Sequence, residues 1–151
     1  MIVLDTNLLS EPLRRNPEPA VLDWLAQSTE AFALSAVSVG ELLTGVHFLP
    51  IGRRREALGA AIESLLESFA GAVLNYDERA ARAYAELKER SRNAGRPIGV
   101  EDGMIAAICI ANGAALATRN VKDFDGLGID VVNPWDSPDH RELSNAFTSE
   151  S

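Results

Sequence analysis

Short apolar runs alternate with longer segments of helical periodicity along most of the chain. The apolar runs predict β-strands at residues 2–4, 31–35, 72–75, 115–118 and 130–132. Strands that alternate with helices in this way are typical of a parallel sheet covered by helices on both faces. The pattern therefore predicts an α/β fold of three layers, with about five parallel strands in the middle.

Apolar residues at helical spacing fill the segments between these strands. They predict helices at residues 6–15, 18–27, 37–49, about 52–68, 77–93 and 101–112. Pro12 disturbs or ends the first helix, and the sequence NPEP at 16–19 separates it from the second. Asp77 is a favourable N-cap for the fifth helix, and Gly95 ends it.

The length of 151 residues predicts one domain with one sizeable core. We expect this domain to span residues 1–136 and residues 137–151 to form a polar C-terminal tail. The longest strictly apolar run, residues 104–111, is too short to cross a bilayer, and no signal peptide is evident. The single cysteine, Cys109, is expected in the core, and a cytoplasmic location is the default.

The net charge of −8 argues against broad, non-specific binding to nucleic acid, which depends on neutralising phosphates. Three basic stretches remain as possible local patches or as ordinary solvated faces, at residues 14–15, 53–55 and 88–96. An acidic total is also what a chain shows when it stores carboxylates in a metal site or binds a basic partner.

Function in parallel sheets lies beyond the carboxyl ends of the strands. Several polar residues follow the predicted strands or occupy the first turns of helices, namely Asp5, Ser35, Ser38, Glu41, Asp102 and the group Thr118, Arg119 and Asn120. Each of these positions also has an ordinary structural explanation, which must be weighed against a functional one.

Two of the acids have clear structural alternatives. Asp5 fits an N-cap for the helix that follows it. Glu41 fits a capping box with Ser38, but if the helix begins earlier, with Ser35 as its cap, Glu41 lies in the second turn and needs a partner.

The remaining acids are balanced in the same way. Glu101 and Asp102 both suit a helix start, where the helix dipole favours negative charge. Asp102 lies on the buried stripe of its helix, so it is the better functional candidate, and Glu101 is the solvated member. Asn120 and Asp123 follow a strand, where a loop also accounts for them.

Three acids at one sheet edge suggest a metal site. Without a cation, Asp5, Glu41 and Asp102 would repel one another and raise each other's pKa. Oxygen ligands without cysteine or histidine favour Mg²⁺ or Mn²⁺, and such an ion clamps phosphate oxygens and activates water. The histidines fall outside this group, because His47 is expected near a core edge and His140 in the tail.

Other reaction classes lack their motifs. No P-loop sequence is present, and no nucleophile elbow or plausible serine–histidine pair supports acyl transfer. A phosphorylation receiver domain also gathers acids around Mg²⁺, but this chain has no aspartate after the middle strand and no acid pair after the first.

Four motifs in order resemble the PIN-domain family, and in particular the VapC-like toxins of type II toxin–antitoxin modules with their FitB-like branch. They are LDTNLLSEP at the start, Ser-x-x-Ser-x-x-Glu-Leu near residue 40, Asp102 followed by Met-Ile-Ala-Ala, and Ala-Thr-Arg-Asn-Val-x-Asp-Phe. The late NPW also resembles the FitB-like branch. The resemblance covers residues 1–136.

The resemblance implies a metal-dependent ribonuclease that hydrolyses RNA phosphodiester bonds with Mg²⁺, for which Mn²⁺ can substitute. It implies Asp5, Glu41 and Asp102 as metal ligands, with Asn7 orienting Asp5 and with support from Thr6, Ser38 and Thr118. It also implies a homodimer, with residues 37–68 as the suggested surface. A small antitoxin would enter the acidic pocket, with DNA contacted only through that antitoxin and no membrane involved.

One departure concerns the fourth acid of many relatives. Directly after Arg119 this chain has Asn120, and the nearest acid is Asp123, so a second metal would be held more weakly or only with RNA present. Both residues stay candidates for the catalytic group. The alternative function is a FitB-like subunit of a DNA-bound regulatory complex with little nuclease activity.

Overall fold

The computed structural model describes residues 1–136, and its elements follow the predicted order. They are β1 (Ile2–Leu4), α1 (Thr6–Ser10), η1 (Glu11–Leu13), α2 (Pro19–Gln27), β2 (Phe32–Ser35), α3 (Ala36–His47), α4 (Arg53–Ser68), β3 (Val73–Leu74), α5 (Glu78–Asn93), α6 (Val100–Ala111), β4 (Ala115–Ala117), η2 (Val121–Phe124) and β5 (Val131–Val132). The α/β class is confirmed. The predicted tail, with His140, lies outside the described residues.

The five strands form one sheet in the order β3-β2-β1-β4-β5, and each neighbouring pair is parallel. The chain builds one half of the sheet outward from β1, then returns to build the other half on the opposite side of β1. In such sheets the point of reversal is where ligands bind. Leu4 pairs with Ala117, so the next residues along, Asp5 and Thr118, emerge side by side at this point.

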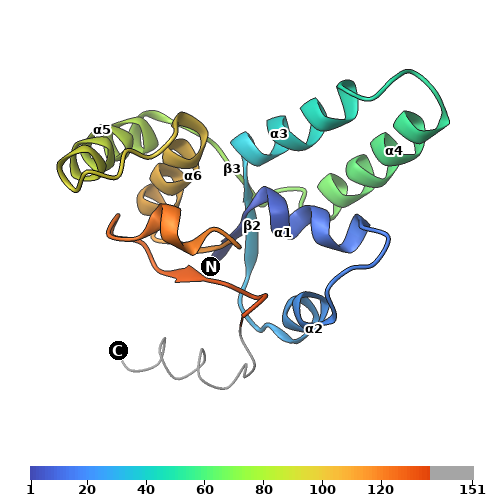
Figure 1. Cartoon of the computed structure of the whole chain (residues 1–151), viewed down its shortest axis with the longest axis horizontal. Coiled ribbons are helices and arrows are strands. Elements are labelled where there is room, and N and C mark those ends of the chain that lie inside the picture. The colour runs from blue at the N-terminus through green and yellow to red at the C-terminus, as the bar shows by residue number, and fades with distance from the viewer. Residues whose placement is uncertain (137–151) are drawn as a thin grey trace.

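Helices cover both faces of the sheet, as predicted (Figure 1). On one face, β1 residues Ile2 and Leu4 pack with side chains from α1, α2, α3 and α4. On the other face, Val3 packs with side chains from α5 and α6. The alternation along β1 thus divides a strand that is buried throughout between two apolar clusters, which explains why the sequence shows a continuous apolar run there.

Three local expectations are corrected or resolved. The helix expected at 6–15 is shorter than predicted, because α1 ends at Ser10 and the chain tightens into the 3-10 turn η1. The predicted disturbance at Pro12 is confirmed, since Pro12 has no N–H to donate to the preceding turn. Helix α3 begins after Ser35, whose side chain accepts a hydrogen bond from the backbone N–H of Ser38, so the capping box at Ser38 does not form. His47 is exposed rather than at a core edge.

Two other expectations are confirmed. The side chain of Asp77 caps α5 by accepting from the N–H of Ala80 at 2.9 Å, and Gly95 follows that helix with φ +71°. Cys109 is buried, and this burial raises the pKa of its thiol to about 12, so it packs as an inert apolar group. Within residues 1–136, no helix is long and apolar enough to span a membrane.

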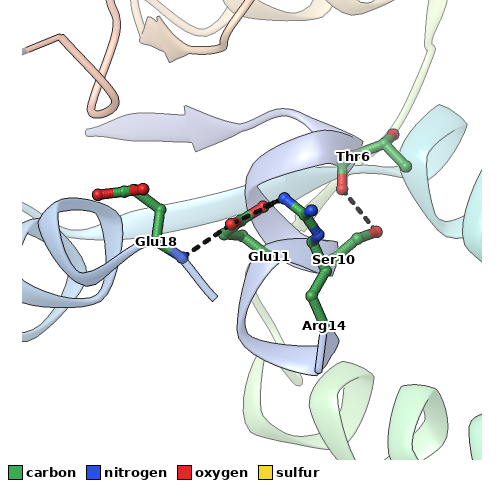
Figure 2. Close-up of polar contacts among 5 residues, drawn as sticks. All are labelled: Thr6, Ser10, Glu11, Arg14 and Glu18. Atoms are coloured by element: carbon green, nitrogen blue, oxygen red, sulfur yellow. Dashed lines mark hydrogen bonds and ion pairs between the residues drawn. The ribbon is translucent and has the colours of Figure 1, made fainter. Parts of the chain in front are cut away.

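A buried carboxylate that the sequence did not indicate joins α1 to α2. Glu11 is only 3% exposed. Its Oε1 accepts from the backbone N–H of Glu18 at 2.9 Å, and Arg14 Nη1 lies 3.2 Å from both of its oxygens (Figure 2). The Glu18 N–H, with Arg14 and Arg119, holds the pKa of Glu11 below its usual value against the opposing effect of burial. This contact fixes the turn that follows the strand carrying Asp5.

Replacing Glu11 by alanine should lower the free energy of unfolding by about 1.5 kcal/mol, the lower end of the range for a hydrogen bond to a charged group. The lower end applies because water can replace the carboxylate as the acceptor for the Glu18 N–H. A carboxyl with a lowered folded pKa stabilises the protein above the ordinary carboxyl range, and this stabilisation is lost as pH falls through the lowered pKa. Urea titrations from pH 7 down to pH 3 should show a shallower loss of stability in Glu11→Ala than in the wild type.

The matched control is Glu11→Gln, which keeps an acceptor for the Glu18 N–H and removes only the charge. It should recover most of the stability lost in Glu11→Ala at pH 7 while keeping the shallower acid dependence. An alanine variant as stable as the wild type would show that the Glu11 contact does not hold the turn.

Candidate metal centre

Asp5 is held rigidly where β1 ends. It is 6% exposed and acts as the N-cap of α1. Its Oδ1 accepts from the backbone N–H of Thr6 at 2.8 Å, and its Oδ2 accepts from the Thr118 hydroxyl at 2.7 Å. A carboxylate oxygen has two acceptor sites, so each oxygen keeps one for another partner. The cap and the site are therefore compatible uses of the same side chain.

Thr118 is the main support of Asp5. It is fully buried at the end of β4, and its Oγ1 also accepts from the backbone N–H of Asn120 at 3.1 Å. That second contact leaves the hydroxyl proton free to point at Asp5. The sequence placed Thr118 in the supporting group, and the structure defines its contact.

A chain of hydroxyl groups links the start of α1 to the start of α3. Thr6 Oγ1 lies 3.1 Å from Ser38 Oγ, which in turn lies 3.3 Å from Ser35 Oγ. Ser35 and Ser38 are both buried. These contacts couple the position of Asp5 to that of the helix that carries Glu41.

Asn7 does not have the contact that the resemblance implied. Its side chain is exposed on α1, and no hydrogen bond joins it to Asp5 in the described structure. Asn7 follows Asp5 by two positions at the start of a helix, where the cap is satisfied by the nearer Thr6 N–H. The orientation of Asp5 is set by Thr6 and Thr118 instead.

Glu41 lies in the second turn of α3, as the earlier helix start required, and is partly buried. Burial raises the pKa of its carboxyl, and the charges of Glu101, Asp5 and Asp102 raise it further, while Thr6 acts in the opposite direction. Glu41 is therefore close enough to three other acids for their charges to raise its pKa.

Asp102 lies in the first turn of α6 and is partly buried, whereas its neighbour Glu101 is exposed. Burial raises the pKa of Asp102, and the charges of Asp5, Asp123 and Glu101 raise it further. Gly99 is the N-cap position of this helix and offers no side-chain cap. The choice of Asp102 over Glu101 as the buried acid agrees with the sequence interpretation.

Asp123, rather than Asn120, adds a fourth charge to this group. Asp123 lies in η2, and its charge raises the pKa of Asp102. Asn120 is exposed; its backbone N–H donates to Thr118 Oγ1, and its backbone carbonyl accepts from the N–H of Asp123. The neighbouring Arg119 lies over the ring of Trp135, 5.3 Å from its centroid.

The four acids come from β1, α3, α6 and η2, which meet at the carboxyl edge of the sheet. Two clefts flank them. One, of about 530 Å³, is lined by Asp102 and Asp123 together with Lys122 and Arg96. The other, of about 500 Å³, runs along α3 and is lined by Glu41. The acids therefore lie between two open grooves.

The donor set matches a hard divalent cation in its chemistry, since carboxylate oxygens predominate and neither cysteine nor histidine takes part. Among residues 1–136, however, no three histidine, cysteine, aspartate or glutamate side chains are grouped closely enough to hold an ion as they stand. Like charges without a cation favour separated rotamers, and binding requires the partly buried Glu41 and Asp102 to turn toward the fixed Asp5.

Thr118→Val is expected to weaken Mg²⁺ binding by about 10- to 100-fold, the usual effect of losing a group that orients a metal ligand. Valine has a similar shape but cannot donate to Asp5, so the carboxylate loses one of its two fixed partners. Isothermal titration with Mg²⁺ measures the change. The control is Thr118→Ser, which keeps the hydroxyl and should bind as the wild type does; equal affinity in all three proteins would exclude Thr118 as the orienting group.

The class of protein follows from this fold and a direct sequence match. The family model described as the PIN domain matches residues 2–128, and the chain belongs to that family. It is similar to the plasmid stability protein StbB of Pseudomonas syringae pv. tomato, with 45% identity over 91% of this chain and 100% of the relative. It is also similar to the VapC ribonuclease Y4jK of Sinorhizobium fredii, with 43% identity over 90% of this chain and 99% of the relative.

Solved structures agree with this relationship. Toxin FitB of Neisseria gonorrhoeae is 39% identical over 89% of this chain and 99% of its own length. A structure of FitAB bound to an IR36 DNA fragment matches with a TM-score of 0.88 and 38% identity, covering 93% of this chain and 99% of the matched chain. The predicted kinship with VapC- and FitB-type toxins is confirmed.

Proposed function

We propose that this protein is a Mg²⁺-dependent endoribonuclease, the toxin of a type II toxin–antitoxin module. The observation that carries the proposal is the convergence of Asp5, Glu41 and Asp102 on one sheet edge between two open grooves, in a chain 43% identical to a protein named as a VapC ribonuclease. Partly buried acids that raise each other's pKa cost stability, and a functional cation explains why they are retained.

Some of these residues would bind the ion, and others hold the ligands in place. Asp5, Glu41 and Asp102 would hold the ion, with Mn²⁺ able to replace Mg²⁺. Asp123 of η2 lines the cleft beside Asp102, and Asn120, which precedes η2, stays a candidate for the catalytic group. An ion held there would supply positive charge for the phosphodiester and would make a bound water a better nucleophile. The position of Asp5 relative to the start of α3 is held by Thr118, Thr6 and Ser38. Glu41 and Asp102 would then turn toward a carboxylate whose position is fixed.

The acidic edge also accounts for the expected inhibitor. A cognate antitoxin that inserts basic side chains between Glu41 and Asp102 would neutralise the same charges that the metal does, and so would exclude RNA. In this proposal the protein works as a cytoplasmic homodimer and contacts DNA only through the antitoxin.

Two observations favour a second function. The structure of FitAB with a DNA fragment resembles this chain closely, with a TM-score of 0.88, and the acids are not grouped as a finished ion site. A protein of the same fold that acts mainly as a subunit of a DNA-bound regulatory complex, with little nuclease activity, would share these features.

Activity in isolation separates the two functions. Purified protein should cut a panel of structured and single-stranded RNAs in Mg²⁺, and EDTA should stop the reaction. Expression of this chain alone should arrest growth, and coexpression of a cognate antitoxin should relieve the arrest. Absence of both cleavage and arrest across a broad screen of metals and RNAs would favour the DNA-bound regulatory subunit.

A further inference from the structure

The turn between α3 and α4 exposes apolar and basic side chains together. The two helices form a hairpin that projects away from the sheet (Figure 1). Near its end Phe48 is 84% exposed and Ile51 is 91% exposed. Arg53 and Arg54, which begin α4, are exposed as well. We call these residues, together with Arg55, the hairpin tip.

The hairpin tip is basic on an acidic molecule. Three consecutive arginines are followed by one acid, Glu56, whereas the whole chain carries a net charge of −8. Arg55 Nη2 lies 2.9 Å from His47 Nδ1. Because a guanidinium has no acceptor, His47 accepts this bond, which fixes Arg55 against α3 and leaves Arg53 and Arg54 facing solvent.

A groove connects the hairpin tip to the acids. The cleft of about 500 Å³ along α3 is lined by Glu41 and Glu101 at one end and by Phe48 at the other. Its floor is made of small residues: a Cβ added at Gly40 or at Gly45 would meet nothing within 4 Å. The seven positions from Glu41 to Phe48 span about 10 Å of helix, a distance that a few nucleotides of single strand can cover.

We propose that the hairpin tip is a second contact for single-stranded RNA, in which an unpaired base stacks on Phe48 and the phosphates beside it contact Arg53 and Arg54. The strand then follows the groove along α3 to Glu41. This inference rests on the proposed ribonuclease function and extends it to how the substrate is held. Exposed aromatic faces beside arginines are the usual platform for single strands, because every base has a face to stack.

The composition of the surface favours this occupant over others. A stable protein interface buries about 1,200–2,000 Å² around an apolar centre. The hairpin tip offers only two apolar side chains, flanked by arginines, so it is too small and too charged to form the centre of such an interface. Duplex RNA keeps its bases stacked on each other, and so cannot use Phe48.

Binding is measured on full-length Asp5→Asn protein, which should not cut the probe, by fluorescence anisotropy with a labelled 12-nucleotide single-stranded RNA. Phe48→Ala should weaken binding by about 5- to 100-fold, the effect of losing one stacked base. Arg53→Ser with Arg54→Ser should flatten the dependence of log K on log salt by about 1.4, since each lost phosphate contact removes about 0.7 for a single strand. The same RNA annealed to its complement should bind with little dependence on Phe48.

The matched control is Arg79→Ser with Arg82→Ser, two exposed arginines on α5, on the other side of the molecule from the hairpin (Figure 1). This pair removes the same charge and should leave the affinity and salt slope nearly as they were. In the cleaving protein, Phe48→Ala should raise KM and leave kcat unchanged, as expected when a contact made equally in ground and transition states is removed.

The outcomes distinguish this inference from the ribonuclease function itself. A wild type that cuts RNA, with tip variants that bind and cut equally well, would overturn the second contact alone. If the wild type cuts no RNA but the tip variants bind RNA more weakly than it does, the ribonuclease function is overturned and the RNA contact at the hairpin tip is supported. If light scattering shows that the tip variants differ from the wild type in molar mass while their RNA affinity is unchanged, the hairpin tip is a contact between copies of the chain and the inference is overturned.

Discussion

Asp5→Asn is expected to lower the rate of Mg²⁺-dependent RNA cleavage by at least about 100-fold while the fold stays intact. The substitution removes the one acid of the site whose position is fixed, and losing a fixed electrostatic group at a reacting centre has effects of about this size. The amide oxygen can still accept from the Thr6 N–H. The Thr118 hydroxyl, which can both donate and accept, can then turn to accept from the amide nitrogen. The measurement is single-turnover cleavage of RNA, with circular dichroism to confirm the fold.

Asp130→Asn is the matched control for this variant. Asp130 is exposed and directly precedes β5, at the amino edge of the same sheet, so the same chemical change falls at the end opposite the acids. It should cleave at the rate of the wild type. Normal cleavage by a folded Asp5→Asn protein would remove Asp5 from the catalytic group.

Asp102→Asn is expected to make the protein more stable without metal and to abolish its stabilisation by Mg²⁺. The pKa of Asp102 is raised by burial and by its acidic neighbours, so its charge is unfavourable in the folded state. Removing that charge should therefore raise the Tm of the metal-free protein. Mg²⁺ at 100 times its Kd should stabilise the wild type by about 2.7 kcal/mol and leave the variant nearly unchanged.

The pH dependence of the metal-free wild type has the corresponding sign. Glu41 and Asp102 have pKa values raised above those of the unfolded chain, so between the ordinary and the raised pKa the folded state binds more protons. Their contribution to stability therefore falls as pH rises through that window. Saturating Mg²⁺ should remove this loss, because the ion replaces the protons.

Differential scanning fluorimetry over pH 4 to 8, with and without Mg²⁺, measures both effects. Glu89→Gln, a neutralised carboxyl on the exposed side of α5, is the control and should keep the full response to Mg²⁺. A lower Tm for metal-free Asp102→Asn, together with an undiminished rise on adding Mg²⁺, would contradict a role for Asp102 in holding the ion.

The strand pattern and the acids of the site were predictable for a local reason. Strands buried on both faces must be apolar along their whole length, so a polar residue directly after one, such as Asp5 or Thr118, stands out in the sequence. Helix starts are marked by caps such as Asp77. Where two caps compete, as at Ser35 and Ser38, the local signals are equal, and only the position of β2 decides which residue begins α3.

Contacts between distant segments were not predictable. Glu11 is an unremarkable acid in the sequence, yet it is buried because the chain turns back and brings the Glu18 N–H onto it. The resemblance implied Asn7 as the partner of Asp5, whereas the partner is Thr118, 113 residues along the chain. Parallel pairing of β1 with β4 creates that contact, and no local pattern encodes the pairing of two strands so far apart.

The sequence by itself determined the α/β class, the positions of the strands and the polar residues, Asp5 and Thr118, that directly follow two of them, because these depend on periodicity and on which residues a buried strand tolerates. Tertiary structure alone decided how the acids are held. It made Asp5 fixed and left Glu41 and Asp102 partly buried. It placed Asp123 in the cleft that Asp102 also lines, and set Phe48 at the end of a groove that leads to Glu41. The physical reason is that burial, hydrogen bonding and charge coupling depend on distances in space, which strand order and helix packing set.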